Sequence, residues 1–233
     1  HSAKPLKGEA ECLDFWLELP RMAGVAIPVF SLRSEDDFGV GEFYDLKKMA
    51  DWAASTGLHI IQLLPINDTT RTKTWKDSYP YSAISSFALH PMYINLPAAG
   101  VKIDKEYKKI QAELNALPMV DYERVNAEKH RLLKKLFSQE GEAVLSSSAC
   151  RKFVKENSEW LKPYAEFCAK RDADDAGYHI FVQYHLAKQM QEARDYAHSK
   201  GVFLKGDLPI GVSRSSVEVQ TSPGLFNLDS QAG

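Results

Sequence analysis

Three short apolar runs constrain most strongly what this chain can fold into. They cover residues 24–32, 58–66 and 202–212, and each is nearly continuous rather than alternating. Runs of this kind are typical of strands covered on both faces, as in a parallel sheet. A helical pattern at residues 43–53 separates the first two runs and is followed by Gly57, the expected glycine cap. Strand, helix and strand joined by short loops predict a βαβ unit.

The segment between the second and third runs has helical periodicity over most of its length. Two apolar stripes, at residues 125–137 and 153–167, follow a spacing of three and four. Residues 92–96 favour a short extended piece, and a further helical pattern at residues 182–197 leads into the third run. Because there is no repeat or low-complexity linker, most of this segment is interpreted as a helical insertion within one domain.

We therefore expect an α/β fold that contains about the first three strands of a (β/α)8 barrel, the TIM-barrel type. Residues 1–21 are expected to form a lead-in, and residues 22–233 the N-terminal portion of the barrel. The mainly helical insertion is placed at about 97–176, between strands two and three. Three strands leave an unpaired edge and exposed apolar faces, so a chain of this extent is expected to need the remaining strands.

Charge and composition exclude several kinds of protein. The 233 residues carry 29 Lys plus Arg and 31 Asp plus Glu, a net charge of −2, which argues against nucleic-acid and polybasic membrane binding. No apolar run approaches the roughly 20 residues of a membrane helix, and no signal-peptide pattern opens the chain. Cys12, Cys150 and Cys168 form no C-x-x-C pair and are expected to be reduced thiols. A cytoplasmic protein is the expectation.

The common cofactor and metal motifs are missing from the sequence. The Gly39-Val40-Gly41 triplet resembles the start of a dinucleotide loop, but Tyr44 stands where the last glycine belongs, so a turn is favoured. There is no P-loop and no H-E-x-x-H, and His179 and His185 are spaced for different faces of a helix. We expect neither a cofactor nor a metal ion.

Two places retain functional interest, each with an alternative interpretation. Asp207 follows an apolar strand, at the end where barrel enzymes carry their active sites, or it serves only its own loop. Tyr81, with Tyr79 and Trp75 nearby, offers an aromatic platform for a sugar ring, or it packs in the core. The residues alone leave both questions open.

Five segments, in this order, resemble the 4-α-glucanotransferases known as amylomaltases or disproportionating enzymes: residues 24–32, 37–43, 62–68, 78–82 and 205–212. The form Asp77-Ser78-Tyr79-Pro80-Tyr81-Ser82 is similar to the branch shared by plant cytosolic enzymes and certain bacteria, whereas typical members have Ser-Pro-Tyr-Gln. The resemblance extends from about Met22 to Gly233.

The resemblance implies retaining transfer of α-1,4-glucosyl units from maltose or maltodextrin to glycogen or another α-glucan. Such chemistry uses two carboxyl groups about 5 to 5.5 Å apart. In the family these follow later barrel strands, so the nucleophile and the acid/base are expected beyond Gly233, and the chain alone is expected to be inactive. The substrate-binding residues implied here are Tyr81, which stacks on a glucose, Asp207, which supports the site, and Ser78, shifted by one position from the typical motif.

Two other functions stay open at this point. A glucan hydrolase of the α-amylase type would share the barrel and the retaining chemistry but would admit water. A non-catalytic glucan-binding or regulatory protein would keep the platform at Tyr81 without the later carboxylates. Besides glucans, the expected partner is the remainder of the same barrel.

Overall fold

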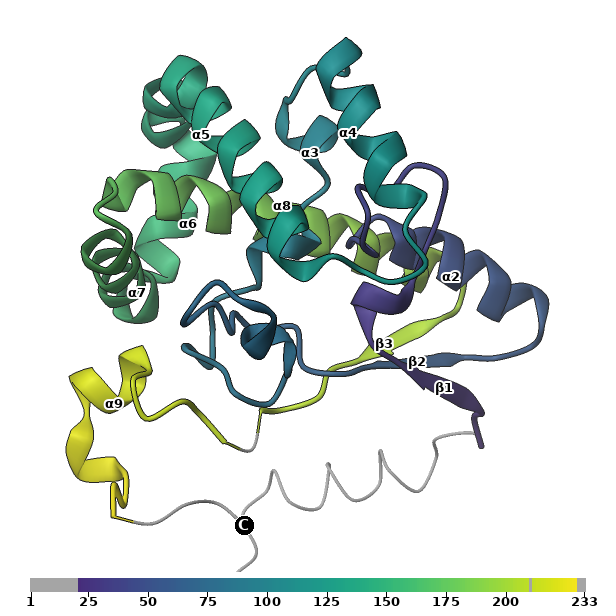
Figure 1. Ribbon diagram of the computed structural model, residues 1–233. Coiled ribbons are helices and arrows are strands. Elements are labelled where there is room, and N and C mark those ends of the chain that lie inside the picture. Colours follow the sequence, from purple (N-terminus) through teal and green to yellow (C-terminus); the bar gives the residue numbers. More distant parts are fainter. Residues whose placement is uncertain (1–20, 210, 230–233) are drawn as a thin grey trace, which may run out of the picture.

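A three-stranded parallel sheet lies at the base of the computed structural model, which describes residues 21–209 and 211–229. Strands β1 (Gly24–Ile27), β2 (Ile60–Leu63) and β3 (Phe203–Lys205) pair in that order, with Ile61 opposite both Val25 and Leu204. The three predicted parallel strands are therefore confirmed (Figure 1). The expected lead-in at residues 1–21 lies outside the described residues except for its last one, as does Ile210 of the third run.

Each strand is shorter than its apolar run because proline ends the hydrogen-bond ladder. Pro28 follows β1, and the chain turns at once into the short 3-10 helix η1 (Val29–Ser31). Pro65 and Pro209 lie shortly beyond β2 and β3. Proline has no N–H to donate, so these residues leave the sheet and are free to form the loops at its carboxyl end.

Among the described residues, helices cover only one face of the sheet. Helices α2 (Asp45–Ser55) and α8 (Ala176–Ser199) lie on that face, where Ile61 and Leu63 are buried. On the other face Ala26 and Phe203 are exposed. The exposed face agrees with the expectation that three strands alone leave apolar surface uncovered, because the described helices lie on one side of the sheet and nothing else described shields the other.

The helical insertion contains most of the remaining elements, and the predicted helices are confirmed. Between β2 and β3 the chain forms the following elements, in addition to α8: η2 (Trp75–Ser78), η3 (Pro91–Tyr93), α3 (Leu96–Ala99), α4 (Lys105–Asn115), α5 (Tyr122–Ser146), α6 (Ser148–Glu156) and α7 (Ser158–Asp172). After β3 come α9 (Val217–Thr221) and η4 (Pro223–Leu225). The described helices include none that is long and apolar enough to cross a membrane.

The extended piece expected at residues 92–96 is wrong. Pro91 is the first residue of η3 and Pro97 the second residue of α3, positions in the first helical turn where proline's fixed φ is favourable. The side chains of His90 and Asn95 cap them by accepting hydrogen bonds from the backbone N–H groups of the first turn.

One hydrophobic core joins the insertion to the sheet. Ile61 and Leu63 of β2 belong to the same buried cluster as Leu133 of α5 and Phe181 and Leu186 of α8. A smaller cluster around Tyr164 lies under the loops. The insertion therefore folds onto the sheet rather than standing apart, and the exact boundaries at 97 and 176 stay a prediction.

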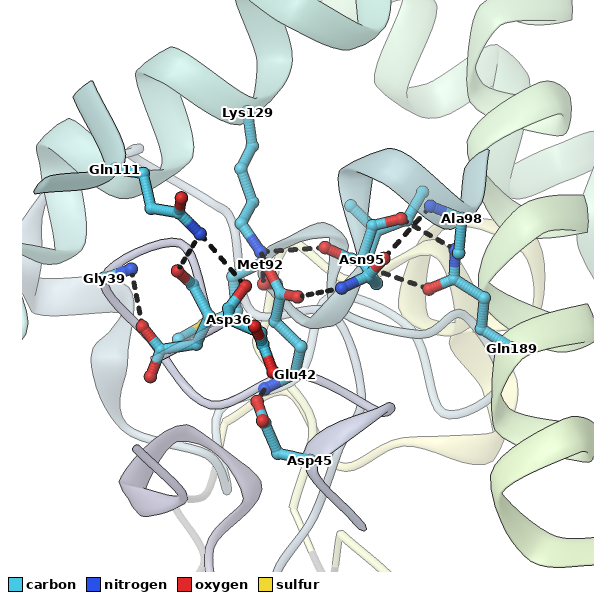
Figure 2. A network of polar contacts seen from close by, with 12 residues as sticks. Asp36, Gly39, Glu42, Asp45, Met92, Asn95, Ala98, Gln111, Lys129 and Gln189 are labelled. Carbon is cyan, nitrogen blue, oxygen red and sulfur yellow. Dashed lines mark hydrogen bonds and ion pairs between the residues drawn. The ribbon is translucent and has the colours of Figure 1, made fainter. Parts of the chain in front are cut away.

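A buried ion pair fastens the insertion to the loop that follows β1. The Nζ of Lys129 in α5 donates to Glu42 Oε1 and to the backbone oxygens of Met92 (2.7 Å) and Ile94 (2.8 Å), so its three protons are used. Glu42 Oε2 accepts from Asn95 Nδ2 at 2.8 Å (Figure 2). We call Glu42, Asn95 and Lys129 the inner anchor. Burial raises the pKa of Glu42 to about 7, although Lys129 opposes the shift, and it lowers the pKa of Lys129.

Two glycines shape the backbone of the segment that leads to Glu42. Gly39 has a φ of +79°, which agrees with the turn predicted for the Gly39-Val40-Gly41 triplet. At Gly41 an added Cβ would lie 2.0 Å from the backbone oxygen of Val29. These glycines therefore serve close backbone packing, and α2 begins only at Asp45.

Candidate functional site

The structure brings together two of the three predicted site residues. Tyr81 Oη donates a hydrogen bond to Asp207 Oδ2 at 2.9 Å, although the two residues are 126 positions apart in the chain. Asp207 lies two residues beyond β3, at the carboxyl end of the sheet. The hydrogen bond to this carboxylate raises the pKa of Tyr81, since it favours the protonated phenol.

Backbone contacts hold the Tyr81 and Asp207 segments side by side. Ala83 forms a parallel bridge with Val212, and the N–H of Ser213 donates to the oxygen of Ala83 at 2.8 Å. Further on, the N–H of Val217 donates to the oxygen of Ile84 at 2.8 Å. The chain after β3 therefore helps to fix the segment that carries Tyr81.

The aromatic residues near Tyr81 are largely outside the core. Tyr79 is 61% exposed and Trp75 is 67% exposed, while Tyr81 is half-buried. The rings of Tyr79 and Tyr81 are 5.6 Å apart and inclined at 48°. Exposed aromatic rings at the end of a parallel sheet offer apolar surface to the C–H face of a sugar. Core packing is therefore not the explanation for Trp75 and Tyr79.

Ser78 lies in a neighbouring cavity rather than with Tyr81 and Asp207. This strand-end cavity has a volume of about 710 Å³ and is bounded by residues that follow β1 and β2 and by the start of the insertion. Its lining includes Phe30, Pro65, Asn67, Trp75, Ser78, Met119 and Tyr122, but not Tyr81 or Asp207. The three candidates therefore divide into a hydrogen-bonded pair and a separate cavity residue.

A buried carboxylate shapes the loop of residues 68–77 that leads to Ser78. Asp77 Oδ2 accepts from the backbone N–H groups of Thr72 and Lys73, each at 2.6 Å. These bonds stabilise Lys73 in a left-handed conformation, with a φ of +60°, which is uncommon outside glycine. Thr69 Oγ1 donates to the backbone oxygen of Asp77 at 2.5 Å and closes the loop.

Helix α7 of the insertion also contacts the loop of residues 68–77. Arg171 of α7 donates two hydrogen bonds of 2.7 Å to Asp172 and others to the backbone oxygen and side chain of Thr70. Lys73 Nζ lies 2.8 Å from Asp172 Oδ1. We call Lys73, Arg171 and Asp172 the outer anchor. Burial would raise the pKa of Asp172, but Arg171 and Lys73 outweigh it and hold the pKa at about 2.

Residues of α5 and α7 complete the support of the loop. Glu123 Oε1 accepts from the N–H of Trp75 at 3.0 Å, and Tyr164 Oη donates to Asp68 Oδ2 at 2.6 Å. His90 Nδ1 accepts from the N–H of Met92, so the proton of the neutral ring is on Nε2 and faces Tyr122 Oη at 2.8 Å. Burial lowers the pKa of His90 to about 4, which keeps this ring neutral near pH 7.

Comparison with known proteins settles the family. The sequence pattern of glycoside hydrolase family 77, described as 4-alpha-glucanotransferase, matches residues 27–177 and 169–233. The chain belongs to the 4-alpha-glucanotransferase family. It is 43% identical to 4-alpha-glucanotransferase DPE2 of Oryza sativa subsp. japonica and 31% identical to the 4-alpha-glucanotransferase of Chlamydia muridarum. These alignments cover 91% and 90% of the chain, but only 26% and 45% of the two relatives, so the chain spans less than half of either.

A solved structure supports the same assignment. The amylomaltase from Streptococcus agalactiae in complex with acarbose superimposes with a TM-score of 0.74 at 26% identity, covering 89% of this chain and 47% of that one. The resemblance to 4-alpha-glucanotransferases found in the sequence motifs is thereby confirmed. The two alternatives, an α-amylase-type hydrolase and a non-catalytic glucan-binding protein, are not favoured by these comparisons.

Among the described residues of this 4-alpha-glucanotransferase chain, one group could be taken for a metal site. Ligand atoms of Asp172, Asp174 and His179 lie within 4.8 Å of one another. Both carboxylates are already paired with cations, however: Asp172 with Lys73 and Arg171, and Asp174 with Lys134. A divalent cation would have to displace these partners. The expectations of no metal and no cofactor stay predictions.

Sequence reasoning missed the residues that position the loop. These residues are Tyr122, Glu123, Tyr164 and Arg171, all of them on helices. The helical pattern places Tyr164 in the apolar stripe at residues 153–167 and Glu123 on a solvated face, and it gives Tyr122 and Arg171 no particular role. The contacts of Glu123, Tyr164 and Arg171 join positions 48 to 101 residues apart in the chain, so no local spacing in the sequence signals them. Cys150 and Cys168 are free and buried, as predicted, whereas Cys12 lies outside the described residues.

Proposed function

We propose that this chain is the N-terminal part of the catalytic barrel of a 4-alpha-glucanotransferase that transfers α-1,4-glucosyl units from maltose or maltodextrin to glycogen or another α-glucan. The observation that carries the proposal is the Tyr81–Asp207 hydrogen bond at the carboxyl end of a parallel sheet, in a chain of this family. In α/β barrels, substrate and catalytic groups gather at that end.

The one-sided sheet supports the barrel part of the proposal. Its uncovered face carries Ala26, Gln62 and Lys205, which share a register position and alternate with the buried face. In a closed (β/α)8 barrel this face points inward and packs against the other strands. The division into residues 22–233 of the barrel and an insertion at about 97–176 is part of the same proposal.

The chemistry we propose is a retaining double displacement by two carboxyl groups located beyond Gly233. One carboxylate attacks the anomeric carbon while a carboxylic acid protonates the departing glycosidic oxygen, which leaves a covalent glucosyl enzyme. The 4-hydroxyl of the acceptor then attacks the same carbon, gives its proton to the second carboxylate, and releases the first. Within this chain, Tyr81 would stack on a glucose ring, Asp207 would fix the Tyr81 phenol, and Ser78 would contact sugar in the strand-end cavity.

Transfer is tested by measuring glucose release from maltose with and without glycogen, in the intact enzyme that joins these residues to the rest of the barrel. Glycogen-stimulated release with longer glucan products is expected, whereas hydrolysis without transfer products would contradict the proposal. The 233 residues alone are expected to release no glucose. We also propose a cytoplasmic location, since the cysteines suggest no disulfide framework.

The role of Tyr81 is tested by removing only its hydroxyl. Tyr81→Phe is expected to lower kcat/KM for transfer about tenfold, because a hydrogen bond to a carboxylate is lost from the site. Tyr79→Phe is the matched control, since Tyr79 is the neighbouring exposed ring. Equal activities of the two variants would show that the Tyr81–Asp207 bond does not serve the reaction.

A further inference from the structure

The carboxylate of Glu218 joins the segment after Tyr81 to the segment after Asp207. Glu218 lies in the first turn of α9, and its Oε1 accepts from the backbone N–H of Ser86 at 2.7 Å and from the hydroxyl of Ser85 at 3.1 Å. These bonds extend the row of backbone contacts between the two segments. The carboxylate therefore lies where the two segments that carry the hydrogen-bonded pair meet.

Ser85 also holds the turn that follows it. Its side chain is buried, and its Oγ accepts from the N–H groups of Phe87 and Ala88, each at 3.2 Å. The backbone oxygen of Ala88 accepts from the N–H of Asp68, beyond the end of β2, at 2.8 Å. Glu218 thus belongs to a hydrogen-bond network that joins the chain after β2 to the chain after β3.

The second carboxylate oxygen of Glu218 makes stability a poor explanation for this residue. Oε2 is buried, and within the part of the chain that the structure describes it has no hydrogen-bond partner. Buried polar atoms are nearly always paired, and exceptions are expected mainly at functional sites. The unpaired oxygen offsets part of the stability that the bonds to Oε1 provide.

The position of the Tyr81 ring depends on how the two segments meet. Asp207 accepts from its hydroxyl at 2.9 Å, and an added Cβ at Gly211 would lie 3.8 Å from its backbone oxygen. The aromatic neighbour Tyr79 is 61% exposed and offers little support. Because a shift of about 1 Å in a group that positions substrate can lower a rate about a hundredfold, the alignment of the segments matters for the reaction.

We propose that Glu218 is a positioning residue of the transfer reaction. Its Oε1 aligns the segment that carries Tyr81 with the segment that carries Asp207, and Glu218 itself does not touch the sugar. This role rests on the proposed function, in which Tyr81 stacks on a glucose ring.

A double-mutant cycle on the intact enzyme tests whether Glu218 acts through Tyr81. Glu218→Ala removes the acceptor of both serines, and Tyr81→Ala removes the ring. The kcat/KM for glucose release from maltose, with glycogen as acceptor, is measured for the unaltered enzyme, the two single variants and the double variant. Glu166→Ala is the matched control, since Glu166 is an exposed glutamate of α7, which packs against α9. Thermal unfolding checks that every variant is folded.

With Tyr81 present, Glu218→Ala is expected to lower kcat/KM about tenfold, and Glu166→Ala to leave it unchanged. In the Tyr81→Ala background, Glu218→Ala is expected to change kcat/KM less than about twofold, because no ring is left to align. An equal effect of Glu218→Ala in both backgrounds would overturn the proposal, since a residue that only stabilises the fold acts whether or not Tyr81 is present.

A milder substitution repeats the cycle if Glu218→Ala does not fold. Glu218→Gln keeps a neutral and weaker acceptor for both serines, so it is expected to lower kcat/KM about threefold with Tyr81 present and not at all without it. The same loss in both backgrounds would again overturn the proposal.

These measurements also separate the role of Glu218 from the proposed function. Full activity of Tyr81→Ala would show that the proposed role of Tyr81 is wrong, and the role of Glu218 falls with it. Lowered activity of Tyr81→Ala, with equal effects of Glu218→Ala in both backgrounds, would overturn only the role of Glu218. Glucose release without longer glucan products would contradict transfer, while the cycle measured on glucose release still decides on Glu218.

Discussion

The inner and outer anchors join the same insertion to two loops of the sheet, but in very different surroundings. The side chains of Lys129 and Glu42 in the inner anchor are each 2% exposed. Burial raises the pKa of Glu42 and lowers the pKa of Lys129, and both shifts favour the neutral form of the group. In the outer anchor, Lys73 is 46% exposed and Asp172 keeps a pKa of about 2. Buried charge is costly if its partner is lost, whereas a partly hydrated pair can rearrange. We therefore expect the inner anchor to contribute more to stability and the outer anchor to act mainly on the shape of the loop of residues 68–77.

The sharpest test of this difference removes the cation of the inner anchor. Lys129→Met leaves Glu42 and the backbone oxygens of Met92 and Ile94 without their donor, and is expected to lower the free energy of unfolding by about 3 to 5 kcal/mol. Chemical denaturation of the intact enzyme measures the change, with the exposed Lys135→Met of the same helix as control. An equal effect of the two substitutions would remove the contrast between the anchors.

Acid should lower stability through two buried histidines near the anchors, whereas the raised pKa of Glu42 in the inner anchor acts in the opposite direction. His90 adjoins the inner anchor and His179 lies near Asp172 of the outer one, and each has its pKa lowered by burial to about 4 from an ordinary 6.5. The unfolded state then binds protons more readily, so stability present above pH 6.5 is lost as the pH falls toward 4.

At pH 5 the expected loss is about 2 kcal/mol for each histidine. Denaturation midpoints at pH 7.5 and pH 5 measure it for the unaltered enzyme and for His90→Gln, with the exposed His59→Gln as control. A pH dependence unaffected by His90→Gln would show that this histidine is not buried in its neutral form.

The outer anchor should respond mainly in substrate binding. Arg171→Lys keeps the charge but loses the two-bond contact with Asp172 and the bonds to Thr70, so about 1 kcal/mol of stability is expected to be lost. Because the loop of residues 68–77 leads directly to Ser78, KM for maltodextrin is expected to rise more than kcat falls. Steady-state kinetics of Arg171→Lys measures both constants. A fall in kcat at constant KM would contradict the prediction.

The smallest change in the free energy of unfolding is expected for an exposed ion pair. Lys48 and Asp36 are 2.6 Å apart, but their side chains are 55% and 80% exposed. Lys48→Ala is expected to change the free energy of unfolding by less than about 0.5 kcal/mol, because water and salt screen such pairs. A larger effect in the same denaturation assay would mean that burial does not distinguish the ion pairs of this protein.

Much of the fold was predictable because it depends on local sequence patterns. The apolar runs located β1, β2 and β3, and helical periodicity located α2, α5 and α8. Strand ends were overestimated where Pro28, Pro65 and Pro209 follow closely. The open face of the sheet agrees with the expectation for three barrel strands, although an apolar run by itself does not say which neighbours cover it.

The candidate site was predictable only in part. The motifs identified Tyr81, Asp207 and Ser78, but not that the first two are hydrogen-bonded while Ser78 lines another cavity. The partners that hold the loop, Glu123 and Arg171 among them, lie 48 to 101 residues away from their contacts in the chain. Their side chains have no periodic signature, because their positions depend on how helices pack and not on spacing within a helix.

The sequence by itself determined the class of fold, the family motifs and the residue types at the strand ends, because strand propensity, helix periodicity and turn chemistry act over a few neighbouring residues. Only the tertiary structure decided that Lys129 neutralises Glu42 in the core and that Asp172 joins Lys73 to Arg171. These contacts join residues far apart in the chain, and their energies depend on the burial that packing creates.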